Sequence, residues 1–209
     1  MIIMSLKNYS SKKWMFKVTK FRMMAAYGLI AGFVSSLAIS GLLLLVEKAI
    51  SLPIGTFYLV ISSTFIESQE YYSLDKIIFG FIMHITVGSI IGLIMCIPFI
   101  VFKDKSVRSM QRYAVPYGLG FGFALWLFLF IPVTLWIILP ILDTSQEGTV
   151  IHQEVPAQVD VMFTTDMVAM LVDRIMIGAV AFNMLYGLLA AIIIKILYEE
   201  SLKNKPNIL

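Results

Sequence analysis

Four long stretches without a charged residue constrain the fold of this chain more than any other feature. They cover residues 23–46, 77–102, 114–142 and 175–194. A helix that crosses a membrane needs roughly 20 mainly apolar residues, because the hydrocarbon core is about 30 Å thick. Each stretch meets this length. The sequence therefore predicts an all-α integral membrane protein, a four-helix bundle with spans at 23–46, 77–102, 114–142 and 175–197.

Composition agrees with a membrane protein. The chain has 209 residues, of which 59% are hydrophobic and 14% charged, and its mean hydropathy is +0.90. Soluble domains carry about 25% charged residues. The first apolar stretch is longer than the core of a cleavable signal peptide, about 7–15 residues, so we expect it to be retained. The single cysteine, Cys96, lies in the second span, which excludes an intrachain disulfide and a cysteine-based zinc site.

The distribution of basic residues predicts the orientation. Thirteen of the 16 Lys and Arg residues lie before the first span, between the second and third, or from the end of the fourth. By the positive-inside rule, both termini are cytoplasmic and the chain is a multi-pass protein of the cell membrane. We expect a basic leader at 1–22, a basic cytoplasmic loop at 103–113 and a cytoplasmic tail at 198–209. We interpret the leader as a topology determinant, with a lipid-headgroup or nucleic-acid patch as the alternative, and expect no nucleic-acid partner.

A short phrase occurs twice and predicts an internal repeat. Residues 27–33 read YGLIAGF and residues 117–123 read YGLGFGF. The second and fourth spans share a weaker phrase that pairs His84 with Asn183 and Gly88 with Gly187. We therefore expect a tandem repeat of a two-helix hairpin, at 23–102 and 114–197. Two copies with the same orientation are expected to be related by a pseudo-two-fold axis along the membrane normal.

Small residues recur every four positions along three of the spans. Examples are Gly28 and Gly32 in the first span, Gly88 and Gly92 in the second, and Gly187 in the fourth. In lipid, helices associate through close backbone approach at such positions, so we expect tight crossings there. The third span departs from this pattern, and its Pro132 predicts a kink, either structural or acting as a gating hinge.

Two outer segments contain apolar stretches too short to span. These are residues 51–74 and 161–172, which we expect at the membrane interface, with a re-entrant loop covered by protein as the alternative. The outer loop 143–174 is acidic. Its carboxylate spacing matches no EF-hand, so a solvated or partner-facing loop is favoured over a metal site.

His84 is the only ionisable side chain deep within the apolar spans, and such groups are functional hypotheses by default. With Asn183 as its repeat partner, it is expected to face the other hairpin near mid-membrane, where the two side chains can hydrogen-bond. A proton or substrate contact and a metal ligand are the alternatives. The thirteen methionines permit a copper-handling hypothesis, although methionine is an ordinary apolar residue. No nucleotide-binding, hydrolase or metalloprotease motif occurs. We therefore predict no catalytic residue, cofactor or resident metal.

The duplicated hairpin with Tyr-Gly-Leu-x-x-Gly-Phe and His-x-x-x-Gly-x-x-x-Gly resembles small prokaryotic four-helix membrane families of unknown function, a resemblance that implies a fold but no activity. A four-span chain of low charge, rich in Ile and Lys, is also similar to auxiliary subunits of archaeal ammonia monooxygenase, a copper membrane complex. No motif carries this second resemblance. A core copper subunit needs several His and Asp ligands, so His84 alone leaves only an accessory role.

These observations favour a non-catalytic accessory or structural subunit of a larger membrane complex, such as a copper membrane monooxygenase. Its partners are the lipid bilayer and other integral membrane subunits. Aromatic residues of the third span, Trp126, Phe130 and Trp136, are the expected partner-facing positions. The alternative is a small permease or channel with a pathway along the pseudo-two-fold axis near His84 and Asn183. An enzyme that uses the acidic outer loop and His152 is the third hypothesis.

Overall fold

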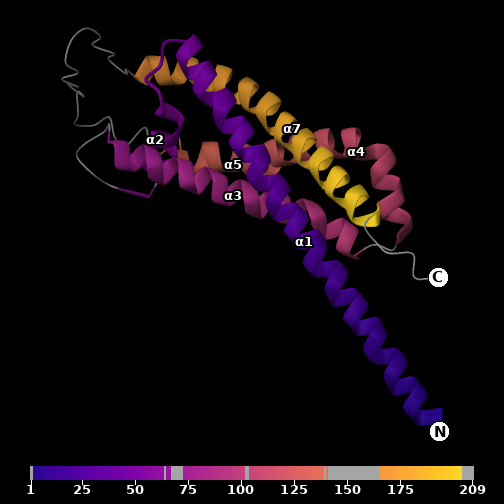
Figure 1. The fold of residues 1–209 in the computed structure, drawn as a ribbon. Coiled ribbons are helices and arrows are strands. Elements are labelled where there is room, and N and C mark those ends of the chain that lie inside the picture. Colours follow the sequence, from indigo (N-terminus) through magenta and orange to yellow (C-terminus); the bar gives the residue numbers. More distant parts are fainter. Residues whose placement is uncertain are drawn as a thin grey trace.

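In the computed structural model, every element of the described part of the chain is a helix (Figure 1). The structure describes residues 2–63, 65–66, 73–101, 104–138, 140 and 165–203. The elements are α1 (Ile2–Ala49), α2 (Thr56–Ser63), α3 (Leu74–Val101), α4 (Asp104–Leu125), the π-helical turn η1 (Trp126–Phe130), α5 (Ile131–Val133), a second π-helical turn η2 (Thr134–Ile138), and α7 (Thr165–Lys203). Most of the predicted acidic outer loop, together with His152, lies outside the described residues.

Four segments are long and apolar enough to cross a membrane. They are Phe21–Ala49, Leu74–Phe99, Arg112–Ile137 and Met176–Lys203. Each overlaps one predicted span, so the all-helical character and the four candidate spans are confirmed. The tandem repeat and the cytoplasmic position of the termini stay predictions.

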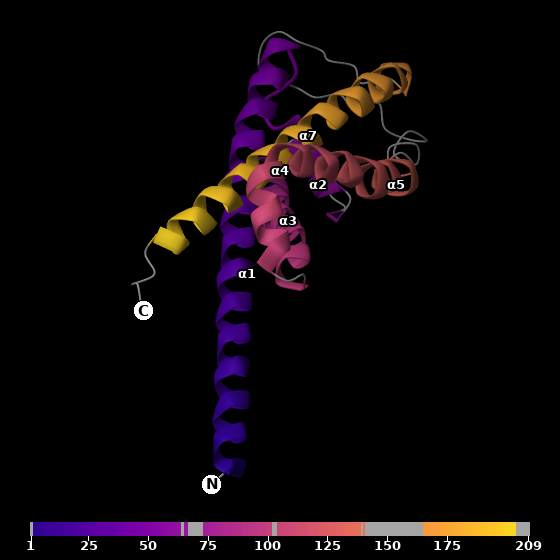
Figure 2. The same cartoon turned by 90° about the vertical axis from the view of Figure 1, so that its right-hand side faces the viewer.

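The first helix is much longer than a membrane span. α1 contains 48 residues, which corresponds to about 72 Å at 1.5 Å per residue, whereas the hydrocarbon core is about 30 Å thick. Figure 2 shows its N-terminal part extending away from the other helices. The predicted leader at 1–22 is therefore helical from Ile2 onward. Likewise, α4 begins at Asp104, within the predicted loop 103–113.

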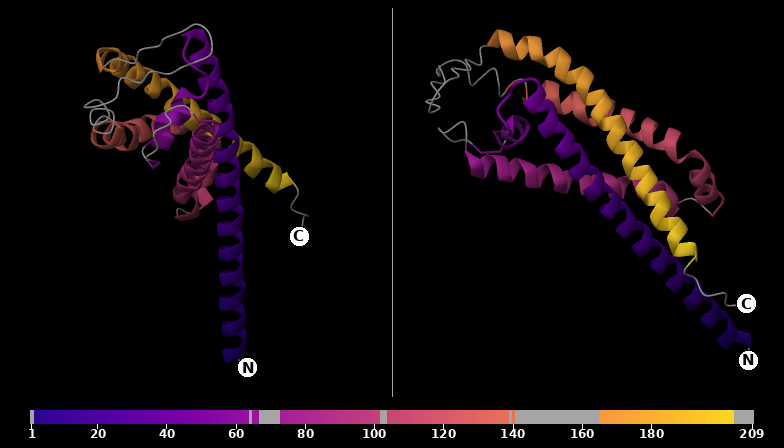
Figure 3. Two further views of the ribbon diagram at one scale, coloured as in Figure 1. Left: turned by 90° about the vertical axis from the view of Figure 1, so that its left-hand side faces the viewer. Right: turned by 45° about the horizontal axis from the view of Figure 1, so that its top comes forward.

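The helices associate as two pairs. α1 packs along α3, and α4 packs along α7, while contacts between α1 and α7 join the pairs. Figures 2 and 3 show α7 crossing α1. Side chains that are fully buried at this junction come from three of the long helices and include Met24, Ala31, Met95, Ala190 and Ile194. α3 and α4, although consecutive in the chain, make few contacts with each other.

Glycines set the distance between the paired helices. A Cβ atom added to Gly28 would lie 2.6 Å from the carbonyl oxygen of Gly92, and one added to Gly32 would meet the carbonyl oxygen of Gly88. In the other pair, a Cβ atom on Gly118 would lie 2.5 Å from the carbonyl oxygen of Gly187. The backbones therefore approach too closely for any larger residue, as expected for small-residue crossings in lipid.

The two glycine crossings differ in register from the pairing of the repeated phrases. In the repeated phrases, Gly28 corresponds to Gly118, and Gly88 corresponds to Gly187. In the structure, Gly28 packs against Gly92, whereas Gly118 packs against Gly187. Similarly, Gly122 meets Asn183 where Gly32 meets Gly88. The contacts thus place Asn183 in the position of Gly88 and not in that of His84, a difference of one helical turn.

The third span is irregular on both sides of Pro132. The π-helical turns η1 and η2 flank it, and the N–H of Ile131 donates to the carbonyl of Trp126 in a wide turn. Proline has no N–H and its ring excludes the carbonyl four residues earlier, which explains why regular α-helix is not maintained there. A second break, which the sequence analysis did not predict, lies at Tyr113 (φ −117°, ψ 23°), three residues before Pro116.

Candidate functional site

The short helix α2 is anchored by a buried carboxylate at the end of the first span. Glu47 accepts hydrogen bonds from the backbone N–H groups of Gly55 and Phe57, each 2.7 Å long. These are among the N–H groups that a helix start leaves without a partner inside the helix, and a negative charge is stabilised at this end. Gly55 adopts a positive φ of 92°, which permits the turn between the carboxylate and α2.

α2 packs closely on α3. Its residues Tyr58, Leu59 and Ser62 are buried, and Gly80 of α3 makes the approach possible, because a Cβ atom there would clash with the carbonyl of Tyr58. The segment that the sequence placed at the membrane interface is therefore covered by protein along this face. This cover is what the alternative of a re-entrant segment requires.

His84 lies in an aromatic environment at this contact. Its ring centroid is 5.7 Å from that of Phe57 and 6.0 Å from that of Tyr58, both in edge-to-face geometry. Its Nε2 atom is buried and has no hydrogen-bond partner among the residues that the structure describes. The histidine thus faces α2 of its own hairpin.

Hydroxyl groups of α1 and α2 line the same region. The hydroxyl of Ser40 lies beside the phenol of Tyr58, although neither group has a hydrogen bond of good geometry within the described part of the chain. Burial raises the pKa of Tyr58; the neighbouring Ser40 hydroxyl opposes this rise, and the negative charge of Glu47 adds to it. Tyr58 is consequently a neutral phenol at physiological pH, able to donate and to accept.

The structure shows no hydrogen bond between the side chains of His84 and Asn183, which the sequence analysis expected. Asn183 donates its Nδ2 hydrogen to the carbonyl oxygen of Ala179, 2.8 Å away in its own helix, and His84 Nε2 has no partner. The bond that crosses between the hairpins comes from Tyr186, whose hydroxyl donates to the carbonyl oxygen of Gly88 at 2.5 Å. The sequence could have indicated this bond, because the phenol of a tyrosine in mid-span needs a hydrogen-bond partner where lipid offers none.

The three aromatic residues predicted to face a partner lie in different environments. Trp126 is directed inward and donates its Nε1 hydrogen to the carbonyl of Met176, 3.1 Å away. Phe130 is half-buried, whereas Trp136 is 78% exposed. Phe128, another aromatic residue of the same span, is 76% exposed.

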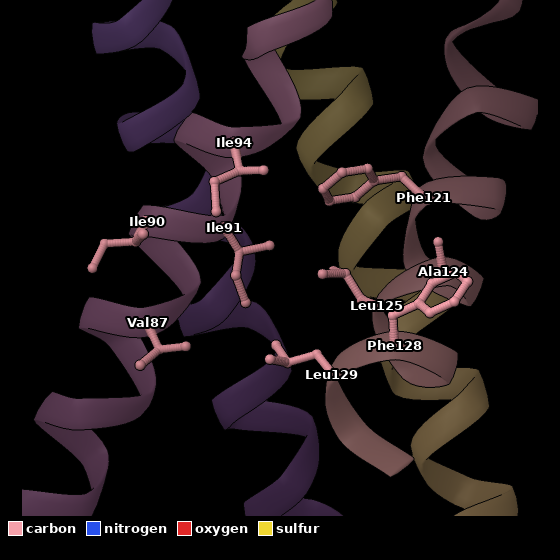
Figure 4. Close-up of a pocket in the computed structure, with 9 residues that line it drawn as sticks. All are labelled: Val87, Ile90, Ile91, Ile94, Phe121, Ala124, Leu125, Phe128 and Leu129. Carbon is pink, nitrogen blue, oxygen red and sulfur yellow. The ribbon is translucent and has the colours of Figure 1, made fainter. Parts of the chain in front are cut away.

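An apolar groove separates α3 from the third span (Figure 4). Its volume is about 440 Å³, and it is lined by Val87, Ile90, Ile91, Ile94, Phe121, Ala124, Leu125, Phe128 and Leu129. In Figure 4, α1 and α7 lie behind it. Because every lining side chain is apolar, the groove can hold only an apolar occupant.

The described residues contain no group of three or more His, Cys, Asp or Glu side chains that could hold a metal ion. Comparison with known protein families, with curated proteins and with solved structures finds no match to this chain. The resemblances considered from the sequence therefore gain no support from these comparisons, and the function is argued from the geometry.

Proposed function

We propose that the protein is a non-catalytic accessory subunit that packs against other chains within a larger membrane complex. The observation that carries this proposal is the open apolar groove between α3 and the third span. Two helices that follow each other in the chain diverge at this face, and the four-helix bundle is left incomplete there. A hydrophobic helix of a partner subunit would complete it.

The rest of the molecule supports a packing role. Where α1 and α7 cross, Ala31, Ala190 and Ile194 are fully buried, so this part of the bundle is already filled. Phe128 belongs to the groove and is 76% exposed. A concave apolar groove can receive a hydrophobic helix of another chain. A copper membrane monooxygenase complex of the kind considered from the sequence is one setting for such a subunit.

Purification in a gentle detergent, followed by mass spectrometry of the associated proteins, tests the proposal. We expect membrane proteins in stoichiometric amounts with the native chain. The variant Ala124→Phe fills the groove and should release them. Ala38→Phe makes the same change at an exposed position of α1 and should retain them. Recovery of the native protein without membrane partners, or equal loss in both variants, would contradict the accessory role.

The second candidate is a small permease, and the observation that favours it is the unpartnered Nε2 atom of His84 beside α2. A polar group at membrane depth is typical of a transport pathway. The filled α1–α7 crossing opposes a pathway along the axis of this structure. Flux in proteoliposomes that is lost in His84→Ala would support transport; flux unaffected by this substitution would leave the accessory role.

A further inference from the structure

The helix α4 is bent into two parts at Tyr113. The backbone of this residue is not helical (φ −117°, ψ 23°), and Pro116 supplies no N–H for the carbonyl of residue 112. The candidate span begins at Arg112, so nearly all of the first part lies outside it. Figures 1 and 2 both show the two parts of α4 at an angle to each other. The first part, residues 104–112, therefore does not continue the direction of the third span.

The bend lies at the edge of the packed core. Ala114, the residue after Tyr113, belongs to the buried cluster that also contains Met24 of α1 and Ile194 of α7. A basic residue lies within two positions of each of these three: Arg22, Arg112 and Lys195. Tyr113 is 51% exposed, and the guanidinium carbon of Arg112 lies 5.9 Å from the centre of its ring. Because tyrosines and basic residues gather where spans reach the lipid headgroups, the bend is expected at this level.

The first part of α4 has an amphipathic sequence. Residues 104–112 read DKSVRSMQR. Lys105, Arg108 and Arg112 are three and four positions apart, so their positions share one side of the helix. The positions of Val107 and Met110, which are also three apart, share the opposite side. A helix with one basic and one apolar side is typical of segments that lie in the plane of the membrane interface.

Charge distinguishes this segment from the end of α7. Residues 104–112 contain three basic residues and one acidic residue, which gives a net charge of +2. Residues 195–203 of α7 are equally long but contain two of each, which gives a net charge of zero. The lysines of α7 lie close to carboxylates, Lys195 at 4.0 Å from Glu199 and Lys203 at 3.5 Å from Glu200. Of these two segments, only that of α4 carries an uncompensated positive charge.

A helix as short as this segment needs a surface beside it. Isolated helices of fewer than about 12–15 residues are marginal in water, and the preceding helix α3 makes few contacts with α4. The membrane interface lies directly beside the start of the third span and can receive the apolar side of the segment. A leaflet that contains anionic lipids also attracts the basic side.

We propose that residues 104–112 form an interfacial helix that binds the anionic headgroups of the leaflet at this end of the bundle. The apolar side lies at the boundary between headgroups and acyl chains, and the basic side lies at the level of the lipid phosphates. Binding fixes the depth at which the third span enters the bilayer. The partner groove is a separate feature, because its lining residues lie between 87 and 94 in α3 and between 121 and 129 in the third span.

Hydrogen exchange in bilayers of two compositions tests the proposal. The full chain is reconstituted in nanodiscs of phosphatidylcholine alone and in nanodiscs that also contain phosphatidylglycerol. Exchange at the amides of residues 104–112 should be severalfold slower in the anionic bilayer, whereas exchange in α3 should be the same in both. Added sodium chloride should reduce the difference, because salt screens the attraction. Sodium phosphate added to the neutral bilayer should give no protection; equal protection by phosphate would assign the segment to free anions and overturn the proposal.

Two double variants show whether the charge of this segment is responsible. Lys105→Gln with Arg108→Gln should abolish the dependence on lipid composition, and glutamine keeps a similar helix propensity. Lys195→Gln with Lys203→Gln removes two basic charges from α7 at the same end and should keep the dependence. Equal exchange of the wild type in both bilayers, or loss of the dependence in both variants, would overturn the proposal. Protection that requires co-purified proteins and not anionic lipid would overturn it as well, and would assign the segment to a protein partner.

Discussion

At the scale of single residues, close backbone contact sets the strictest requirements on side-chain identity. A Cβ atom on Gly92 would lie 2.6 Å from the Cα atom of Gly32, backbone that cannot move aside. Gly92→Ala should therefore destabilise the protein, by about 1–3 kcal/mol as is usual for overpacked sites. The measurement is the melting temperature in detergent, with a fall of several degrees expected.

Gly41 supplies the matched control for this substitution. It lies in the same span as Gly32, but nothing lies within 4 Å of a Cβ atom added to it. Gly41→Ala should be neutral or slightly stabilising, because alanine favours helix by about 1 kcal/mol over glycine. Equal effects of the two substitutions would show that helix propensity, and not the α1–α3 crossing, governs stability.

At the scale of secondary-structure elements, α2 depends on a residue outside itself. Glu47 accepts from two N–H groups at its start, and hydrogen bonds to charged groups contribute about 1.5–3 kcal/mol. Glu47→Gln replaces one acceptor by an N–H₂ donor that opposes a backbone N–H. We expect faster hydrogen exchange at the amides of α2, measured by mass spectrometry, while the amides of α3 keep their protection.

Glu200→Gln is the control for the Glu47 experiment. Glu200 pairs with Lys203 at 3.5 Å on an exposed part of α7, and pairs of this kind contribute little. Exchange in α2 should match the wild type in this variant. If Glu47→Gln leaves exchange in α2 unchanged as well, then packing on Gly80 and His84 alone holds the helix.

The same elements show what could be predicted from the sequence. Long uncharged stretches predict membrane helices, because the bilayer thickness fixes their length. Close approach at Gly28 and Gly92 follows from small residues four positions apart. The docking of α2 does not follow, because it depends on contacts between Glu47 and residues eight and ten positions later. Matching phrases could not fix the register of Asn183 either, since packing decides which turn faces Gly122.

At the scale of the whole molecule, the two helix pairs differ in how completely they are covered. The face where α1 meets α7 is filled, and Tyr186 adds a hydrogen bond across the pairs. The opposite face, between α3 and the third span, stays open as the apolar groove. Because of this asymmetry, contacts at one face stabilise the bundle, whereas the other face is open to a neighbouring chain.

The orientation of the molecule in the membrane is the last prediction, and it rests on the excess of Lys and Arg at one end. The native Cys96 is buried, so it should not react with a membrane-impermeant maleimide. Lys48 and Lys203 are exposed near opposite ends of the spans. On intact cells, Lys48→Cys should be labelled, and Lys203→Cys should react only after the cells are opened. Labelling of Lys203→Cys alone on intact cells would invert the predicted orientation and place both termini outside.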